Sequence, residues 1–274
     1  MKRTLLFVIC SFFALTMTAK TVTPAASLPA YYEAIDGKSG KSLFDAVQKV
    51  TKTGYSSLGY DGLWAAYKYT DLYDNGYVWD MYSDCTWKSI NSNHCGNYSD
   101  ECDCYNREHS IPKSWYGGTT SGPGCDIFHL VPTDGKVNGI RSNYPFGEVG
   151  SADYNKHGNK RGSAKSITIT GGNTIAGNTG TTVSASGTVF EPRDEYKGDF
   201  ARGYMGALLK WAGDKAFTEG EGSKTFTTNF STGSFGLTKY GVALLMKWHR
   251  QDPVSQKEVD RNNGIQQTQG NRNP

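Results

Sequence analysis

The sequence lacks the features of a membrane-spanning or strongly charged protein. Beyond the N-terminal segment, none of its 274 residues lies in a hydrophobic run long enough to cross a bilayer. The 29 Lys and Arg residues nearly balance the 26 Asp and Glu residues, which gives a formal net charge of +3. Global charge therefore does not indicate a polyanionic partner, and any phosphate binding has to come from locally placed groups.

Recognisable zinc motifs are also missing. The chain has only five histidines, and no pair of them has the spacing of zinc ligands, which disfavours a zinc hydrolase. One of the six cysteines lies in the N-terminal segment, and the other five are Cys85, Cys95, Cys102, Cys104 and Cys125. The "CDC" spacing is tight for two ligands of one zinc ion, so we expect disulfides, whose connectivity the sequence does not give. Because five is an odd number, at least one thiol is left over.

The N-terminus has the pattern of an export signal. A basic start is followed by the apolar stretch Thr4–Thr16 and by small residues that offer cleavage after Ala19, or as late as Ala26. An uncleaved anchor is the alternative, but the stretch is short for a membrane span. We expect residues 1–19 to be a signal peptide and the protein to be secreted or periplasmic, with no membrane attachment after cleavage. Loss of the two basic residues at the start lowers the formal net charge to +1.

The remaining residues, 27–274, show no internal repeat and no long linker, which predicts a single domain. Apolar residues at near-helical spacing predict a helix in residues 42–54, ending at Gly54. Residues 62–71 fit either a helix or a strand. The alternation in "YVWDMYSDCTW", residues 77–87, predicts a strand.

The middle of the chain predicts a strand, a short helix and a small sheet. Residues 127–131 suit a short strand, and Pro132 suits the first turn of a helix that carries Asn138 and Arg141 on one face. Residues 151–188 are rich in Gly, Ser, Thr and Asn, and β-branched residues recur among them. We expect an ordered edge hairpin in this insertion, with a flexible linker as the alternative.

The C-terminal third predicts three helices. Residues 191–214 carry an apolar stripe at helical spacing, which core packing explains. Residues 236–250 form a second amphipathic pattern that Asp252-Pro253 interrupts. Ser255 and Glu258 then have the spacing of a capping box, which predicts the start of a last helix. Helices together with short alternating segments indicate the α+β class.

The stretch "NREHSIPKSW", residues 106–115, places Glu108 directly beside His109. Hydrolysis of a phosphodiester needs a base that takes a proton from water, and neutral imidazole titrates in the right range. It also needs a hard cation, and magnesium requires only one or two protein oxygens because it keeps several waters. Glu108 offers a carboxylate, His109 a base and Asn138 an amide oxygen. From composition alone, a solvated surface pair is the default explanation of Glu-His.

Adjacent side chains of an extended strand point to opposite faces. Glu108 and His109 can therefore share a site only if the strand ends or bends at that point, and the following "SIP" makes such an end plausible.

Three blocks of the sequence, taken together, resemble the endonuclease I family of secreted or periplasmic nucleases. They are "NREHSIPKSW", "DIFHLVPTDGKVNGIRSNYPFGEV" and the C-terminal "DPVSQKEVDRNNGIQQTQGNRNP". The resemblance runs from about Tyr82 to the C-terminus, with poor matching across 151–188. It implies a ββα-metal finger, also called a His-Me finger, embedded in a mixed, largely helical domain with small antiparallel sheets.

The resemblance also implies roles for individual residues. His109 matches the general base, and Glu108 and Asn138 match the protein ligands of Mg²⁺, for which Mn²⁺ or Ca²⁺ are expected substitutes. The implied activity is cleavage of DNA, and possibly RNA, with little sequence preference, by what we expect to be a monomer. The family often places an arginine beside the phosphate, and residues 113–125 contain none. Arg141 is the first candidate for that role, with Arg202 and Arg272 as alternatives.

Several other residues have two readings each. His129 lies in an apolar context and is expected to be structural rather than a second base. Asp126 either orients His109 or is an ordinary loop carboxylate, and Arg141 either holds a phosphate or pairs with an acid to brace the Asn138 helix. Asn143 is expected to cap that helix, with metal ligation in place of Asn138 as the alternative. The other three histidines, His94, His157 and His249, are expected at the solvated surface.

A non-catalytic function remains the alternative. The Tyr- and Gly-rich composition and the small net charge also fit a disulfide-stapled surface or adhesion module, whose binding face would be the Ser/Thr strands of 165–188. Nuclease activity with divalent cations would distinguish the two.

Overall fold

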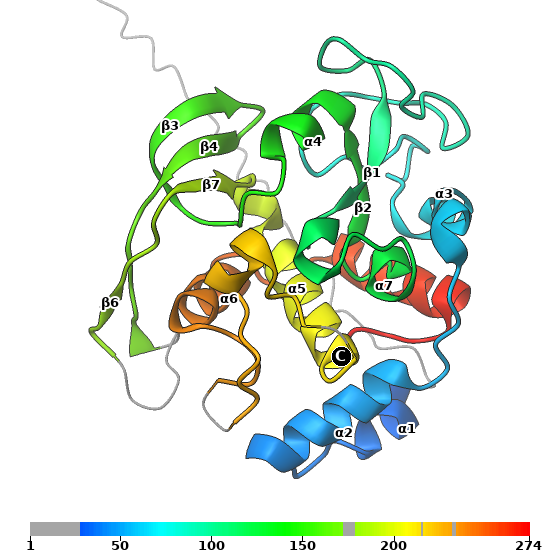
Figure 1. Ribbon diagram of the computed structural model, residues 1–274. Helices are drawn as coiled ribbons and strands as arrows, with labels where there is room; N and C mark the ends of the chain where they lie inside the picture. The colour runs from blue at the N-terminus through cyan, green and yellow to red at the C-terminus, as the bar shows by residue number, and fades with distance from the viewer. Residues whose placement is uncertain (1–27, 172–178, 215, 232–233) are drawn as a thin grey trace, which may run out of the picture.

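The computed structural model describes residues 28–171, 179–214, 216–231 and 234–274. The predicted signal peptide lies outside these residues. Within them the fold is α+β, as predicted, with one two-stranded antiparallel sheet among the helices and two further small antiparallel sheets at one edge of the molecule (Figure 1). No helix in the described ranges has both the length and the apolar character needed to span a membrane.

The N-terminal third is helical. It consists of α1 (Leu28–Glu33), α2 (Gly40–Lys52) and α3 (Gly59–Thr70). Of the two readings of residues 62–71, the helix is therefore correct. The strand predicted for 77–87 is wrong, because that segment has only an isolated bridge between Val78 and Leu72. The aromatic side chains of this segment are buried in the core. An alternating pattern of buried residues can therefore arise without pairing to a neighbouring strand.

A hairpin and a short helix form the centre of the molecule, which we call the ββα unit. Strand β1 (Tyr105–His109) pairs antiparallel with β2 (Leu130–Asp134), so that Glu108 lies opposite Val131. Helix α4 (Gly135–Arg141) follows β2 without a loop and packs against both strands. Between the strands lie two 3-10 turns, η1 (Lys113–Tyr116) and η2 (Gly122–Cys125).

The structure corrects the predicted position of Pro132. It lies within β2 rather than at the start of the helix. The helix starts at Gly135, because the Asp134 side chain accepts a hydrogen bond from the backbone N–H of Val137 at 2.8 Å and so caps it.

The insertion near 151–188 contains strands. Three strands form a sheet of order β3-β4-β7, and a small pair, β5 and β6, lies along the chain between β4 and β7. The paired β5 and β6 confirm an antiparallel hairpin in this segment. The strands are β3 (Val149–Lys156), β4 (Asn159–Ala164), β5 (Ile167–Thr168), β6 (Thr182–Val183) and β7 (Thr188–Glu191).

The C-terminal helices pack against both the sheets and the ββα unit. They are α5 (Lys197–Trp211), α6 (Lys239–Gln251) and α7 (Gln256–Gln269), with the 3-10 turn η4 (Asp194–Tyr196) before α5 and the 3-10 turn η5 (Gly220–Lys224) between α5 and α6. The helix predicted for 191–214 starts later than expected, because residues up to Glu191 belong to β7. The predicted cap of α7 is confirmed, since the Ser255 hydroxyl accepts from the Glu258 N–H at 3.1 Å.

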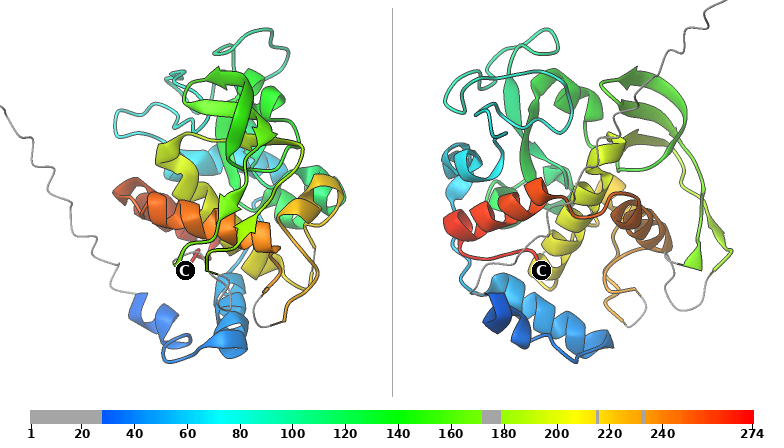
Figure 2. Two further views of the ribbon diagram at one scale, coloured as in Figure 1. Left: turned by 90° about the vertical axis from the view of Figure 1, so that its left-hand side faces the viewer. Right: turned by 180° about the vertical axis from the view of Figure 1, so that it is seen from behind.

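Two hydrophobic clusters fix the position of the ββα unit. One lies between α5, α6 and the three-stranded sheet and includes Phe146, Phe200 and Tyr204. The other packs α3 and α7 against β1 and β2, with Tyr105 and Leu130 at its centre. Because the hairpin is clamped from both sides, the residues at its end are held on a rigid support (Figure 2).

Candidate active site

Strand β1 ends at His109. The chain can therefore bend at this point, which is the condition for the adjacent side chains of Glu108 and His109 to share one site. The Arg141 guanidinium, from the end of α4, lies against this strand end. It donates to the backbone carbonyls of His109 at 3.2 Å and Ser110 at 2.5 Å, while Nη1 lies 3.2 Å from the Glu108 carboxylate. The helix therefore fixes both the backbone turn and the acid.

Glu108 is a buried carboxylate with two side-chain partners on the same oxygen. The Tyr82 hydroxyl donates to Oε1 at 2.9 Å, and the Arg141 Nη1 contact falls on Oε1 as well. These two partners leave Oε2 to other groups. Burial raises the pKa of Glu108, and Arg141 opposes that effect. A buried carboxylate of this kind gains from a cation placed beside it.

His109 is held by the backbone of η2. Its Nε2 lies 3.1 Å from the carbonyl oxygen of Gly124, and because a carbonyl only accepts, the proton is on Nε2 and the lone pair is on Nδ1. Burial lowers the pKa of His109 to about 3, with a further contribution from His129. The imidazole is therefore neutral at pH 7, and Nδ1 is available to accept a proton.

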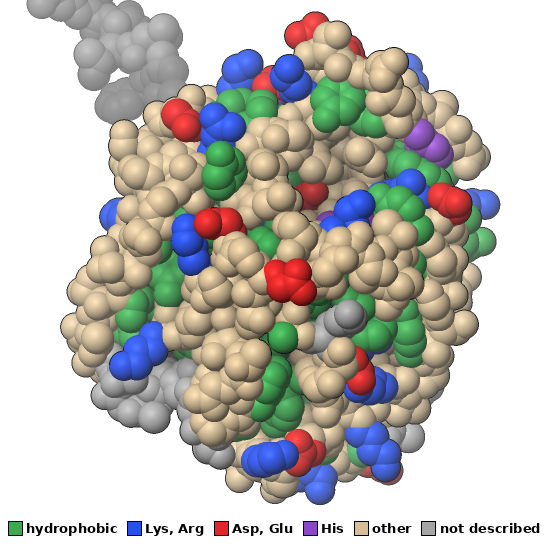
Figure 3. Space-filling model, viewed as in Figure 1, with side chains coloured by type: hydrophobic (Ala, Val, Ile, Leu, Met, Phe, Trp, Pro, Cys, Tyr) green, Lys and Arg blue, Asp and Glu red, His purple; other side chains and the backbone are tan. Residues whose placement is uncertain are grey.

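An aromatic wall lies against the His109 ring. Tyr60 of α3 stacks on it with ring centroids 5.6 Å apart, and the Arg107 guanidinium lies 3.6 Å from the centroid of the Tyr60 ring. Trp64 flanks the same guanidinium at 4.5 Å. Lys113 is a further cation at this edge, 5.8 Å from the centroid of the Tyr60 ring. On the face shown in Figure 3, a recessed acidic side chain lies near a histidine and a basic side chain.

Asn138 projects from the middle turn of α4. It is half-buried, and its side chain makes no hydrogen bond to any described residue, so the amide oxygen is free for a ligand. The helix that carries it packs directly on the strand that carries Glu108. A carboxylate and an amide oxygen are the hard donors that Mg²⁺ accepts, with water completing the shell. The donor set therefore fits a divalent cation of this type.

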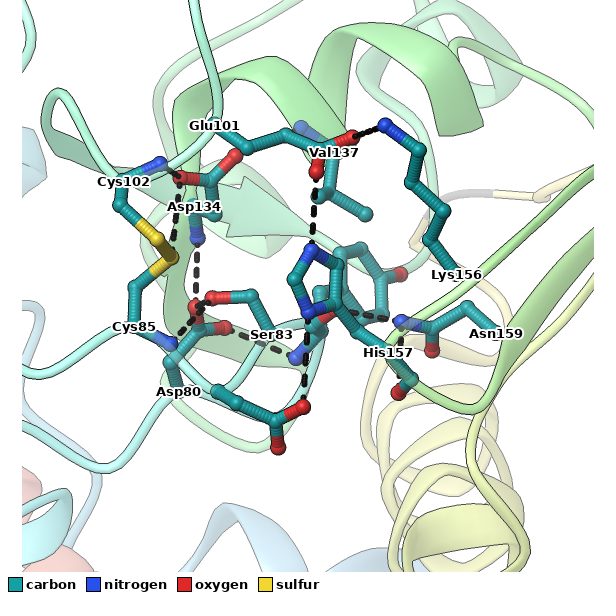
Figure 4. Close-up of a disulfide and its surroundings, with 12 residues drawn as sticks. Asp80, Ser83, Cys85, Glu101, Cys102, Asp134, Val137, Lys156, His157 and Asn159 are labelled. Carbon is teal, nitrogen blue, oxygen red and sulfur yellow. Dashed lines mark hydrogen bonds and ion pairs between the residues drawn. A yellow bond between two sulfur atoms is a disulfide. The ribbon is translucent and has the colours of Figure 1, made fainter.

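The start of α4 is tied to a disulfide-rich loop, residues 85–104, which we call the disulfide loop (Figure 4). Disulfides join Cys85 to Cys102 and Cys95 to Cys104, and Cys125 is free and buried, so the expectation of disulfides with one leftover thiol is confirmed. Asp134 accepts from the Cys102 N–H at 2.7 Å through the oxygen that does not cap α4.

The Cys85, Cys102 and Asp134 side chains form one group with the proximity of metal ligands. Both sulfurs are in a disulfide, however, and a disulfide sulfur lacks the thiolate charge that binds metal, so this group is structural. It fixes the helix cap, and thereby the helix that carries Asn138.

Asp126 and His129, two further candidates, make no hydrogen bond to the His109 side chain. Asp126 does not orient His109, because it pairs with Lys210 at 2.9 Å and accepts from Trp211 at 2.7 Å. His129 is structural, as expected: it is buried, and Nε2 lies 2.8 Å from the Pro123 carbonyl oxygen.

Two of the candidate arginines bind elsewhere. Arg202 pairs with Glu258 at 2.5 Å, and Arg272 donates to Asn263 and Gln266. Arg141 itself is 1% exposed, and its contacts are those of the alternative reading, in which it braces the helix by pairing with an acid.

The three histidines expected at the solvated surface are half-buried and have partners, and the expected helix cap lies one residue earlier. His94 stacks on Trp64 with ring centroids 3.7 Å apart, and His249 contacts Arg202. His157 bridges Glu101 and Asp84, which ties the β3–β4 hairpin to the disulfide loop (Figure 4). The residue that ends α4 is Ser142, with a positive φ of 53°, rather than Asn143.

Three contributors escaped the sequence analysis. The Tyr82 hydroxyl, the Gly124 carbonyl and the Tyr60 ring all contact the Glu-His pair from segments far along the chain. The only available signal was the Gly- and Pro-rich run "SGPG", which indicates a tight turn after the motif.

The chain is similar to known proteins over most of its length. A family model described as Endonuclease I matches residues 39–274. An extracellular ribonuclease of Bacillus amyloliquefaciens is 33% identical over 263 residues, which cover 94% of this chain and 78% of that protein. An extracellular ribonuclease of Bacillus subtilis is 31% identical over 268 residues, which cover 95% of this chain and 80% of that protein.

Proposed function

Because the chain belongs to the Endonuclease I family, we propose that it is an exported, magnesium-dependent endonuclease without sequence specificity, in which His109 is the general base and Glu108 and Asn138 hold the metal. Phosphodiester hydrolysis itself follows from the family. The base, the metal ligands, the ion and the substrate preference are the proposal. The observation that supports it is the end of β1, where a neutral imidazole with a free Nδ1 adjoins a buried carboxylate.

His109 acts on the attacking water in this scheme. The Gly124 carbonyl and the Tyr60 ring fix the imidazole, so Nδ1 points toward a fixed position and accepts the proton of the water. A pKa of about 3 would make a weak base in the free protein. The negative charge of a bound phosphate stabilises the imidazolium and raises this pKa, so base strength increases when substrate is present.

Glu108 and Asn138 supply the oxygen ligands. A bound Mg²⁺ would stabilise negative charge on the phosphate and on the leaving oxygen. Tyr82 and Arg141 hold the Glu108 carboxylate in place, which makes Arg141 a positioning residue in this proposal rather than a phosphate contact. Lys113, beside the aromatic wall, is the cation we assign to the phosphate.

RNA is the first substrate to test, because both relatives are named ribonucleases. A single-stranded substrate suits a site built on one strand end and an aromatic wall, whereas the resemblance of the motifs implies DNA as well. Export, predicted from the N-terminal segment, agrees with the two disulfides and with the extracellular relatives. Family membership also favours catalysis over the adhesion module that the composition left open.

The test is digestion of RNA, single-stranded DNA and plasmid with magnesium, with chelator, and with other divalent cations. The proposal predicts cleavage that chelator stops and magnesium restores. His109→Ala should reduce the rate by about 10³-fold or more, whereas Ser114→Ala, an exposed change in the same segment, should leave it unchanged. Full activity of a folded His109→Ala protein would show that the base is another residue.

A further inference from the structure

Strand β1 carries an arginine on the same side as the proposed base. Arg107 and His109 are two positions apart in β1, and side chains at this spacing point to the same face of a strand. The Arg107 side chain is 13% exposed, so neighbouring groups enclose most of it. The proposed mechanism leaves this cation without a role.

Arg107 holds the ring, the backbone and the hydroxyl of Tyr60, which follows the start of α3. The guanidinium carbon lies 3.6 Å from the centroid of the Tyr60 ring, and Nη1 donates to the Tyr60 backbone carbonyl at 2.7 Å. Burial raises the pKa of Tyr60, and the charge of Arg107 and a hydrogen bond from its side chain oppose that effect. The position of the whole tyrosine therefore depends on one guanidinium.

The guanidinium is itself held by a second ring. Trp64, four positions further along α3, flanks it at 4.5 Å, and His94 stacks on Trp64 with ring centroids 3.7 Å apart. Tyr60 in turn stacks on His109, with 5.6 Å between the ring centroids and 22° between the ring planes. Contacts between planar groups therefore run without a break from the disulfide-rich side of the site to the base.

Arg107 is poorly placed to bind a phosphate itself. Nη1 already donates to the Tyr60 carbonyl and to the Asp61 carboxylate, the latter at 3.1 Å, and Nε is buried without a hydrogen-bond partner among the described residues. A bidentate contact with a phosphate needs two N–H groups that are free and accessible. The occupied Nη1 and the enclosed Nε do not meet this requirement, so the geometry favours a role that acts through Tyr60.

We propose that Arg107 is a positioning residue, which holds the Tyr60 ring against the imidazole of His109 so that Nδ1 faces the attacking water. This inference rests on the proposed function, in which His109 is the base. The Gly124 carbonyl fixes one nitrogen of the imidazole, and a ring stacked on the imidazole face restricts the tilt of its plane. The proposed substrate contacts, the metal and Lys113, do not depend on this stack.

The experiment measures kcat and KM with magnesium, on a nucleic acid that the protein cleaves, for Arg107→Leu, Arg107→Lys and Tyr60→Leu. We expect about a tenfold loss of kcat with unchanged KM in each variant. Lysine keeps the charge but not the planar group, so it should not restore the rate. Lys113→Met should instead raise KM, and Arg250→Lys, at an exposed position of α6, should change neither constant.

A double variant tests whether Arg107 acts through Tyr60. In the Tyr60→Leu background, Arg107→Leu should cause no further loss of kcat, because the contact that it removes is already absent. An additive loss, a higher KM or full activity of Arg107→Lys would overturn the proposal. A lower free energy of unfolding in urea with unchanged kcat would also overturn it, because Arg107 would then only stabilise the fold.

A measurement without catalysis keeps this inference separate from the proposed function. The NMR resonance of the His109 ring proton is the one that His109→Ala lacks, and the adjacent Tyr60 ring shifts it. Arg107→Leu, or Arg107→Lys if the leucine variant does not fold, should move this resonance in the same direction as Tyr60→Leu does. An unmoved resonance would overturn the positioning role. A fully active His109→Ala protein together with a moved resonance would instead refute the proposed base.

Discussion

One irregular loop precedes the ββα unit and another connects its two strands, and these loops hold the two halves of the active site by different means. The disulfide loop is joined by two covalent bridges and fixes the cap of α4, which carries Asn138. The glycine loop, residues 117–125, has no bridge, and its Gly124 carbonyl positions His109. The half of the site that carries the metal ligand Asn138, which we call the ligand side, is thus fixed covalently. The half that carries His109, the base side, is fixed by hydrogen bonds and packing.

This difference has a physical reason. A metal ligand on a helix of only seven residues depends on the helix start, and the cap of so short a helix benefits from covalent support. An imidazole needs only one correctly placed carbonyl to fix its tautomer. Different substitutions should therefore impair magnesium binding and the action of the base.

The largest effect should come from Glu108→Gln, which keeps the shape of the side chain and removes its charge. We expect a loss of about 10³-fold in kcat/KM, together with a higher magnesium concentration for half-maximal rate. Titration of the rate with magnesium measures both. A variant with unchanged magnesium dependence would exclude Glu108 as a ligand.

Removal of one bridge by Cys85→Ala with Cys102→Ala should perturb the ligand side. The bridge closes a separation of 17 residues, so its loss should lower the free energy of unfolding by about 3 kcal/mol. The magnesium requirement should rise as well, because the cap of α4 loosens.

Urea unfolding and magnesium titration test this pair of effects. Cys125→Ser, a change at the free thiol, is the control and should leave the magnesium requirement unchanged. A bridge-free protein with the same magnesium requirement would contradict the link between the disulfide and the metal ligands.

The base side should be sensitive to acid. Burial lowers the pKa of His129 to about 4, below the ordinary value of 6.5, so the unfolded chain binds this proton more readily. The stability that neutral His129 contributes is complete above pH 6.5 and is lost as the pH falls toward 4, by up to about 3 kcal/mol.

Comparison of His129→Gln with the parent isolates this contribution from those of other groups. The difference between the two unfolding free energies should change by that amount between pH 7 and pH 4. A constant difference would show that His129 does not titrate across this range.

The smallest effect should follow Gly124→Ala. An added Cβ would collide with the Thr119 carbonyl oxygen, so the loop must move and the Gly124 carbonyl with it. We expect about a tenfold loss of kcat with little change in KM or in magnesium requirement. Gly96→Ala, at a position with open space, is the control in the other loop. If Gly124→Ala lost only magnesium affinity, Gly124 would support the metal ligands rather than the base, which would contradict the account.

The parts of the site that sequence reasoning found are those encoded locally. The end of β1 follows from the residues after His109, and the cap of α7 from the spacing of Ser255 and Glu258. Both depend on neighbours within a few positions, which a single sequence displays.

The parts that sequence reasoning missed depend on tertiary contacts. Tyr82 contacts Glu108 across 26 positions of the sequence, and Tyr60 contacts His109 from helix α3. The strand expected at 77–87 failed for the same reason, because its alternation reflects burial in an irregular segment that Asp80 organises by accepting from the N–H groups of Tyr82 and Asp134. Burial patterns alone do not reveal which backbone partner a segment has.

The most direct test of the account is an anomalous difference map from a crystal of the protein grown with Mn²⁺. We predict a peak about 2.1 to 2.3 Å from a Glu108 carboxylate oxygen and from the Asn138 amide oxygen, with His109 Nδ1 facing the same space. A peak elsewhere in the molecule, or one beside Glu108 with Asn138 turned away, would contradict it.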